Sequence, residues 1–395
     1  MECYKGKKAI GELYNFEGFS FNQINKKDSV IIELKKKRKT GICPVCNKTR
    51  RKVIETRIRK IRDENYSKEK CFIMLKTYRI ICKGCYRGME KLDLILPGEK
   101  FTNRFAEHIF SLCEKMPLKD VAEYSMINWR TAKRIDKKML KEKFKDLKNI
   151  NPKRIGIDEI AHEKGHKYLT IVRDLDGGVI WVGEKRKKET LDQFFKELGK
   201  RKSKKITVAV IDMWEPYISS IKDNTNAGIV FDKFHIAKKI NEAVDKIRKK
   251  EFANADPEER KRMKHKRFLF LFRNKNLNNE KKDSLRNLLE LNSTLYIAYI
   301  LKEQVLDIFD EKKKDAAMQR LERWVENVQK IDMEEFKEVL NTMERYWYGI
   351  ENYFRHRVTN GASEGYNNKI NIIKRRAYGF KDIEYFKLKI LQSCS

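Results

Sequence analysis

Residues 154–212 read RIGIDEIAHEKGHKYLTIVRDLDGGVIWVGEKRKKETLDQFFKELGKRKSKKITVAVID, and this stretch decides the fold of the larger part of the chain. Three short apolar segments, at 154–158, 168–172 and 179–182, are separated by polar turns and predict three successive strands. The segment 206–212 is apolar almost throughout, which is typical of a strand that a sheet buries on both faces.

The elements around these strands complete the order. Thr190 can cap a helix over 191–198, a second helix follows the strand at 206–212, and 228–232 predicts a fifth strand. Three strands, helix, strand, helix, strand is the order of the RNase H-like fold. The sequence therefore predicts a mixed α/β sheet of that kind.

Two carboxylates mark the ends of predicted strands. Asp158 ends the first strand and Asp212 ends the fourth, and these strands are neighbours in the predicted fold. Both side chains would then emerge together at one edge of the sheet. Two close carboxylates repel each other, and divalent cations relieve this while positioning a phosphodiester for attack. The alternative is that each aspartate only caps the element that follows it.

A third carboxylate lies in NGASEGYNNKI at 360–370, which opens a predicted helix through about Ala377. One polar stripe of this helix consists of Glu364, Asn368, Asn371 and Arg375. An apolar stripe on the other side consists of Tyr366, Ile370, Ile373 and Ala377. Such a helix can pack on the sheet and hold Glu364 over its edge, with Asn368 and Arg375 as donors for phosphate.

Four of the eight cysteines form two pairs with two residues between the thiols, Cys43 with Cys46 and Cys82 with Cys85. This spacing lets both sulfurs of a pair reach one ion, and two pairs complete the tetrahedral shell of a structural zinc. The residues between the pairs predict a β-hairpin or a small sheet with a polar turn at 63–65. Two unconnected turns or a redox pair are the alternatives. The other cysteines are expected to be buried or incidental thiols: Cys3, Cys71, Cys113 and Cys394.

Residues 102–140 predict helices with the layout of a helix-turn-helix. Thr102 can cap a helix to about Met116, and Asn128 can cap the last helix. The expected buried positions are Val121, Ala122, Ile127, Ala132 and Ile135. The basic side chains expected to face DNA are Arg130, Lys133, Arg134 and Lys137. Met126 stands where many such turns have glycine, and an ordinary helical hairpin with a basic face is the alternative.

The composition favours a polyanionic partner. The chain has 395 residues and a formal net charge of +33, and residues 1–150 hold 38 basic against 19 acidic side chains. Nucleic acid is the commonest partner of a soluble protein with such a surplus, although a general lysine bias would also raise the charge. No apolar run approaches the roughly 20 residues that span a bilayer, and the N-terminus does not resemble a secretory signal. An intracellular protein is expected.

These patterns predict five segments. They are a four-cysteine zinc module with an N-terminal extension at 1–98, a helix-turn-helix domain at 99–150, the first part of the sheet core at 151–239, an α-helical insertion at 240–355, and the last part of the core at 356–395. The insertion has aromatic residues that could stack on DNA bases, although core packing is the more common role: Trp324, Tyr346, Trp347, Tyr348, Tyr353 and Phe354. His235 could contact substrate or serve a structural role.

The chain resembles a known family. The resemblance lies in GIDEIAHEKGH at 156–166, VAVIDMWEPY at 208–217, FDKFHI at 231–236 and NGASEGYNNKINIIKRRAYGF at 360–380. These residues look like those of DDE-type insertion-sequence transposases of the insertion-sequence-L-three group. The cysteine module and the helix-turn-helix match that group as well, so the resemblance covers nearly the whole chain.

The resemblance implies Asp158, Asp212 and Glu364 as the catalytic, metal-binding triad, with two Mg²⁺ ions, or Mn²⁺ in their place, and one structural Zn²⁺. It implies terminal inverted repeats and target DNA as partners, a homodimer or higher oligomer on DNA, and a prokaryotic, nucleoid-associated location. The expected reaction is phosphodiester hydrolysis followed by strand transfer. A zinc-dependent DNA-binding regulator derived from a transposase and an RNase H-like nuclease are the alternatives.

Overall fold

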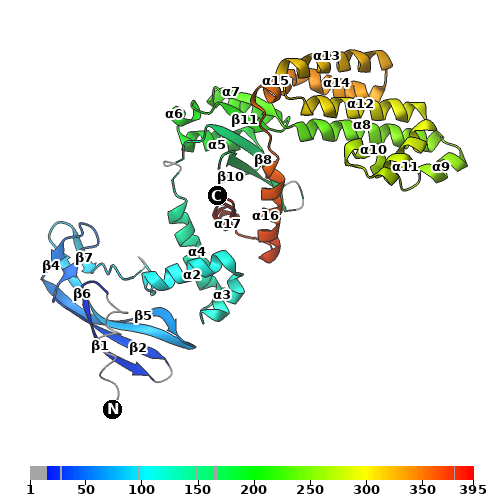
Figure 1. Ribbon diagram of the computed structural model, residues 1–395. Coiled ribbons are helices and arrows are strands. Elements are labelled where there is room, and N and C mark those ends of the chain that lie inside the picture. Colours follow the sequence, from blue (N-terminus) through cyan, green and yellow to red (C-terminus); the bar gives the residue numbers. More distant parts are fainter. Residues whose placement is uncertain are drawn as a thin grey trace. The chain divides into compact units, whose positions relative to one another are not determined.

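The computed structural model describes residues 16–26, 29–95, 98–146, 150–163, 165, 167–377 and 379–395 (Figure 1). The chain forms two compact units, each made of two segments. The N-terminal unit comprises Met1–Lys145 and Arg375–Leu388, and the second unit comprises Asp146–Lys374 and Lys389–Ser395. Over the described ranges, every helix is too short or too polar to cross a membrane.

The N-terminal unit contains a five-stranded sheet. Its order is β1 (Phe19–Lys26), β2 (Val30–Lys36), β6 (Glu69–Cys82) and β5 (Val53–Tyr66), and β7 (Tyr86–Met89) also pairs with β6. β2 and β6 run parallel, whereas the other pairs are antiparallel. Alternate residues of β2, Val30, Ile32 and Leu34, are buried in the core on one face.

The hairpin predicted between the cysteine pairs is formed by β5 and β6, but its turn differs from the prediction. Residues 63–65 belong to β5, and the chain reverses at Ser67, whose φ of 56° is left-handed. Asp63 is fully buried within the strand. This is possible because the Thr102 hydroxyl donates to its carboxylate at 2.6 Å and Arg104 forms an ion pair with it.

The predicted helix-turn-helix consists of α2 (Asn103–Lys115), α3 (Leu118–Tyr124) and α4 (Trp129–Lys143). Both predicted caps are confirmed, because the Thr102 side chain accepts from the N–H of Phe105 at 3.2 Å and Asn128 accepts from that of Arg130 at 2.9 Å. Met126 has a φ of 54°, the left-handed conformation that explains why glycine is preferred there.

The C-terminal segment Arg375–Leu388 packs with these helices. Tyr385 and Leu388 of α17 (Ile383–Cys394) share a buried cluster with Leu140 of α4. The Tyr385 hydroxyl donates a hydrogen bond to Asp136, which is itself fully buried. The stretch predicted as the last part of the core thus contributes Arg375–Leu388 to the N-terminal unit and Lys389–Ser395 to the second unit.

The second unit contains a mixed sheet. Its order is β10 (Val179–Glu184), β9 (Lys167–Asp174), β8 (Arg154–Glu163), β11 (Val208–Ile211) and β12 (Gly228–Phe231). The first three strands are antiparallel, and β8, β11 and β12 are parallel. The predicted adjacency of the first and fourth strands is therefore confirmed. β8 extends beyond the predicted end at Asp158, because its second half pairs with β9 up to Glu163.

Helices cover both faces of this sheet. On one face lie α5 (Lys188–Leu198), the short α6 (Lys200–Ser203) and α7 (Glu215–Asn224), with Ala209 and Ile211 of β11 in their core. Val208 and Val210 of the same strand belong to the core of the helical region on the other face. The alternation of a strand thus divides β11 between two cores.

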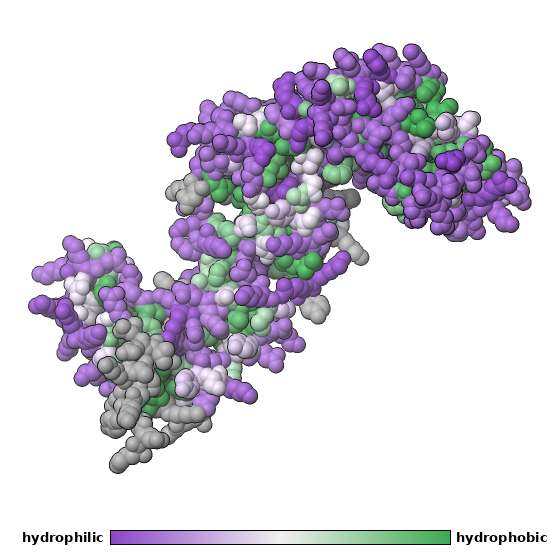
Figure 2. Space-filling model, viewed as in Figure 1, coloured by the Kyte–Doolittle hydropathy of each residue, from purple (hydrophilic) through white to green (hydrophobic). Residues whose placement is uncertain are grey.

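A run of helices follows β12. They are α8 (Lys233–Asn254), α9 (Pro257–Met263), α10 (Arg267–Leu271), the 3-10 turn Asn274–Asn276, α11 (Asn279–Glu290), α12 (Ser293–Asp310), α13 (Lys314–Ile331), α14 (Glu334–Arg345) and α15 (Trp347–His356). In Figure 1, α8 and α12 run side by side. The visible surface of this region is mostly hydrophilic, with scattered hydrophobic groups (Figure 2).

Most aromatic residues considered for DNA stacking lie in the helical core. Trp324, Tyr346, Tyr353 and Phe354 are buried, so their rings are not available to a base. Tyr348 is more accessible, and its ring packs against Phe231 at 5.5 Å between centroids. Core packing, the more common role of such aromatic residues, accounts for these four buried side chains.

Candidate functional site

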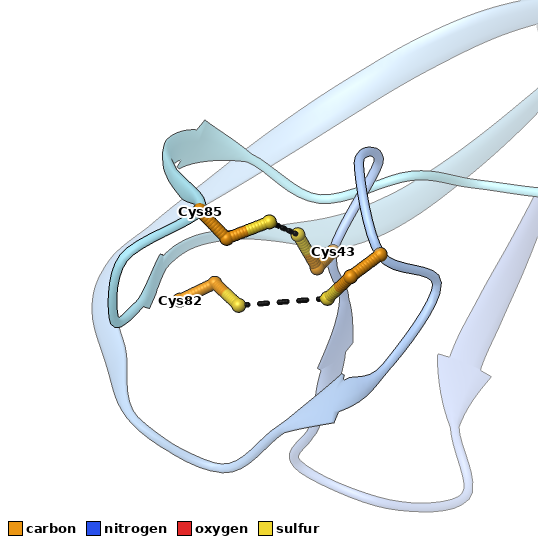
Figure 3. Close-up of side chains that lie close together, drawn as sticks. Cys43, Cys82 and Cys85 are labelled. Atoms are coloured by element: carbon orange, nitrogen blue, oxygen red, sulfur yellow. Dashed lines mark hydrogen bonds between the residues drawn. The ribbon is translucent and has the colours of Figure 1, made fainter.

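The four predicted zinc ligands converge. The sulfur atoms of Cys43, Cys46, Cys82 and Cys85 all lie within 4.8 Å of one another, although 36 residues separate Cys46 from Cys82. In Figure 3, Cys43 and Cys85 point toward each other, with their sulfurs 3.7 Å apart. The sulfurs of Cys46 and Cys82 are 3.6 Å apart. All four are free thiols, so this spacing fits one ion.

Two tight turns produce this convergence. Cys43 and Cys46 lie in the turn between β3 (Gly41–Ile42) and β4 (Thr49–Arg50), and Asn47 closes it with a φ of 56°. The second pair lies between β6 and β7, where Gly84 has a φ of 71°. These left-handed residues bend each turn enough for both of its sulfurs to face the same point.

The surroundings of the cluster favour a thiolate at Cys43, whereas burial and hydrogen bonds with the neighbouring thiols raise the pKa of Cys85 to about 12. Arg50 Nε donates to Cys82 Sγ at 3.1 Å, which places a positive charge beside the sulfurs. Burial alone would raise the pKa of the Cys43 thiol. The backbone N–H groups of Cys46 and Val45, together with neighbouring thiols, instead lower that pKa to about 6. Because zinc binds the thiolate form, the donor set fits a structural zinc.

Asp158 lies within β8, and Asp212 directly follows the neighbouring strand β11. In the parallel register Gly156 of β8 faces Val210 of β11, and each aspartate comes two residues later. Burial raises the pKa of Asp158, and the negative charge of Asp212 contributes to the rise. The Oδ1 atom of Asp212 is buried and has no hydrogen-bond partner within the described part of the chain. The pair can therefore accept a cation.

The FDKFHI motif adds two groups to this pair. His235 Nε2 lies 2.8 Å from Asp212 Oδ2, and this hydrogen bond raises the pKa of His235. Asp232 is buried and caps α8 by accepting from the N–H of Phe234 at 3.1 Å. The backbone N–H of Asn360 also donates to Asp232, so the motif contacts the segment that leads into α16 (Ala362–Arg376).

The α16 helix places an unpredicted residue at the aspartates. Asn367 Nδ2 donates to Asp158 Oδ2 at 2.9 Å. Ser363 and Ile370 are buried on the same side of the helix. Tyr366, a member of the predicted apolar stripe, donates to the carbonyl of Gly177 at 3.2 Å. Asn367 could have been found from its position one helical turn after Ser363 and beside the apolar stripe.

The structure does not bring Glu364 to the aspartates. Glu364 is exposed near the start of α16, and so are Asn368 and Arg375. Among the residues that the structure describes, the cysteine cluster is the one group of three or more His, Cys, Asp or Glu with ligand atoms within 4.8 Å of one another. Asn367, and not Glu364, lies on the side of the helix that meets Asp158.

The predicted DNA-contacting side chains have different surroundings. Arg130 is exposed at the start of α4. Lys133 and Lys137 both form ion pairs with Asp382 at 2.9 Å, so two of the predicted donors already have a carboxylate partner. Arg134 forms an ion pair with Glu99. Arg130 is therefore the most available of the four.

A helix-turn-helix is typical of proteins that bind DNA. Residues 155–390 match a protein family whose description is transposase. Residues 90–138 match the helix-turn-helix domain of transposase family ISL3. The chain belongs to this transposase family.

Two relatives span much of the chain. The transposase for insertion sequence element IS1001 of Bordetella parapertussis is 29% identical over 395 residues, which cover 97% of each chain. The transposase for insertion sequence element IS1557 of Mycobacterium tuberculosis is 28% identical over 287 residues, covering 66% of this chain and 64% of the relative. The family resemblance inferred from the motifs is thus confirmed.

Proposed function

We propose that this chain is a DNA transposase that binds the terminal inverted repeats of an insertion sequence and catalyses metal-dependent phosphodiester hydrolysis and strand transfer. The observation that carries the proposal is the pairing of Asp158 and Asp212 on neighbouring strands of a sheet in a family of transposases. The strand order and helical insertion support an RNase H-like core as the scaffold.

The residues present fit divalent metal ions. Carboxylate oxygens are the ligands that Mg²⁺ prefers, and Asp212 Oδ1 is a buried oxygen without a partner among the described residues. Asp158 and Asp212 would hold two Mg²⁺ ions, or Mn²⁺ in their place, with Glu364 as the third carboxylate. When bound, the ions would neutralise the carboxylates and polarise the scissile phosphodiester.

The side chains around the pair orient it. Asn367 holds Oδ2 of Asp158, the Glu159 N–H donates to Oδ1 of Asp158 at 2.8 Å, and His235 holds Oδ2 of Asp212. Asp212 Oδ1 is left without a partner among the described residues and can face a ligand. Such contacts fix the direction of a metal-binding carboxylate before the ligand arrives. Glu364 joins the pair in this proposal by a rotation of its exposed side chain or by adjustment of the start of α16.

The N-terminal unit would bind DNA. One Zn²⁺ held by Cys43, Cys46, Cys82 and Cys85 would stabilise the strands beside the helix-turn-helix. Arg130 would contact the terminal repeat directly, and Lys133, Arg134 and Lys137 would do so by exchanging a carboxylate for a phosphate. We place the protein on nucleoid DNA in a prokaryotic cytoplasm, as a homodimer or higher oligomer that holds two DNA ends.

Cleavage of a labelled terminal-repeat duplex with Mg²⁺ tests the proposal. The wild-type chain should produce a 3′-hydroxyl end, and Asp212→Asn should bind the duplex but not cleave it. Asp174→Asn is a matched control on the same sheet, because Asp174 ends β9 and contacts none of the proposed ligands. Equal cleavage by wild type and Asp212→Asn would refute the proposed chemistry.

A further inference from the structure

Arg186 is a cation that the proposed function does not use, and two of its partners lie one and two residues from the candidate catalytic aspartates. It lies between β10 and α5, after Lys185, whose φ of 71° is left-handed. Arg186 Nη1 donates to Glu159 Oε1 at 2.8 Å, and the Arg186 carbonyl accepts from Trp214 Nε1 at 3.2 Å. Three separate segments of the unit therefore meet at this side chain.

Two aromatic rings hold the guanidinium. Its Cζ lies 4.3 Å from the ring centroid of Tyr168 and 4.7 Å from that of Trp214. Cation–π contacts and the ion pair to Glu159 together fix the plane of the guanidinium. The Arg186 side chain is nevertheless 34% exposed, so a ligand can reach it without any rearrangement.

The partners of Arg186 adjoin the candidate metal ligands. Glu159 follows Asp158 directly in β8, and Trp214 lies two residues after Asp212. Arg186 is therefore linked to each candidate metal ligand through a partner that lies one or two residues from that ligand.

The guanidinium retains donors for a ligand. Glu159 is its hydrogen-bond acceptor in the described structure, and a single carboxylate oxygen occupies only part of a planar fork of N–H groups. An anion with two oxygens in one plane matches the remaining edge, and a phosphodiester offers such a pair. A cluster of carboxylates repels DNA, and a fixed cation next to it offsets that repulsion.

We propose that Arg186 binds a backbone phosphate adjacent to the scissile phosphodiester, with Glu159, Tyr168 and Trp214 orienting its guanidinium. This inference rests on the proposed transposase function and adds to it a substrate-binding residue. Glu159 then serves to orient Arg186 and is not a metal ligand, although it lies next to Asp158.

The test combines protein variants with DNA in which one phosphate at a time is replaced by a neutral methylphosphonate. Single-turnover cleavage of terminal-repeat duplexes is measured with the full chain and Mg²⁺. At subsaturating DNA, Arg186→Ala should cleave about ten- to a hundredfold more slowly than wild type. The cleavage rate of the wild type should fall about tenfold when one phosphate beside the cleavage site is neutralised. The rate of Arg186→Ala should not fall further when the phosphate at that position is neutralised.

Two variants complete the design. Arg154→Ala is the matched control, because Arg154 begins β8 and forms an exposed ion pair with Asp176 but has no aromatic partners at the site. It should retain the wild-type rate and the wild-type pattern of phosphate sensitivity. Arg186→Lys keeps the charge and loses the fork, so it should recover part of the rate. It also supplies the same comparison if Arg186→Ala does not fold.

The outcomes separate the two proposals. If the loss in Arg186→Ala adds to the loss at every neutralised phosphate, Arg186 has only a structural role and this inference is wrong. If Arg186→Ala cleaves the duplex at the wild-type rate, the inference about Arg186 is also wrong. If wild type itself cuts no terminal-repeat duplex, the proposed function fails and the inference falls with it.

Discussion

At the residue scale, the two oxygens of Asp212 have different surroundings. Oδ2 lies 2.8 Å from His235 Nε2, whereas Oδ1 is buried with no hydrogen-bond partner among the described residues. A buried carboxylate oxygen without a partner is unfavourable, so such an atom marks a place where a bound cation would stabilise the site. Burial also disfavours the charged form of the Asp158 carboxyl and raises its pKa.

The three carboxylates should act as a unit. We expect Asp158→Asn, Asp212→Asn and Glu364→Gln each to bind the terminal repeat normally and to reduce Mg²⁺-dependent cleavage by about three orders of magnitude or more. A double variant should be scarcely worse than a single one. Band-shift assays measure binding and gel analysis of labelled duplex measures cleavage. Substantial cleavage by Glu364→Gln would show that another residue completes the site.

Asn367 should affect metal affinity. Replacing it with Ala removes the donor to Asp158 Oδ2, so that the Glu159 N–H on Oδ1 becomes the remaining hydrogen bond that orients this carboxylate among the described residues. Loss of such an orienting contact typically weakens metal binding by about 10- to 100-fold, so Asn367→Ala should need more Mg²⁺ for half-maximal cleavage. Asn368→Ala, at the next and exposed position of α16, should leave the Mg²⁺ titration unchanged. Identical titrations for both variants would count against this role.

At the element scale, the C-terminal segment is part of the DNA-binding unit. Asp382 pairs with Lys133 and Lys137, and Glu384 pairs with Lys137 and Lys141. Aromatic residues of the segment bury Leu140 of α4. One face of the predicted recognition helix is therefore covered by residues that lie far away in the sequence.

The ion pairs of Asp382 should make the unit sensitive to acid. Burial would raise the pKa of Asp382, but hydrogen bonds from Lys133 and Lys137 hold it well below its ordinary value. A carboxyl with a lowered folded-state pKa stabilises the fold fully above its unfolded pKa, near about 4, and this stabilisation is lost as the pH falls further.

We expect Asp382→Asn to lower the melting temperature at neutral pH and to flatten the loss of stability below about pH 4. Thermal unfolding followed by circular dichroism across this pH range measures both effects. Glu142→Gln removes an exposed ion pair with Lys145 and serves as the control, since such pairs contribute little. Parallel stability curves for wild type and Asp382→Asn would contradict the assignment.

The cysteine cluster should couple metal content to folding. Purified protein should hold one Zn²⁺, and Cys43→Ser should lose the metal and unfold the strands around it, because zinc ligation supplies folding free energy in such modules. Elemental analysis and circular dichroism measure the two quantities. Cys113 is a buried residue of α2, so the Cys113→Ala variant should keep its zinc and serves as the control. A protein with reduced thiols and no zinc would disprove the site.

At the scale of the whole molecule, the charge of +33 should dominate DNA affinity. Each phosphate contact releases counterions, so affinity falls steeply with salt. Between 50 and 200 mM salt we expect a loss of about a thousandfold or more if roughly six or more contacts form. Arg130→Ala should reduce the slope of log affinity against log salt concentration by the equivalent of about one phosphate contact. Lys133→Ala should reduce this slope by less, because Lys133 already pairs with Asp382. Equal slopes for all three proteins would refute this ranking.

Local signals in the sequence determined much of this protein. The caps Thr102 and Asn128 were predictable because a capping side chain bonds backbone only two or three residues away. The cysteine turns were predictable because ligand spacing is a local property, and the order of strands and helices followed from apolar patterning. Asp158 and Asp212 were found as a pair because the apolar patterning also indicates where their two strands lie.

The tertiary structure alone decided which groups meet across long distances in the chain. The pairing of Lys137 with Asp382 joins residues 245 positions apart, and no periodicity indicates such a contact. The choice of Asn367 over Glu364 at Asp158 depends on how α16 is rotated against the sheet, which the packing of Ser363 and Ile370 sets. Arg186 acquires its partners from three separate segments in the same way. Helical phase and long-range pairing depend on the sum of many packing contacts, so they are determined only when the whole unit has folded.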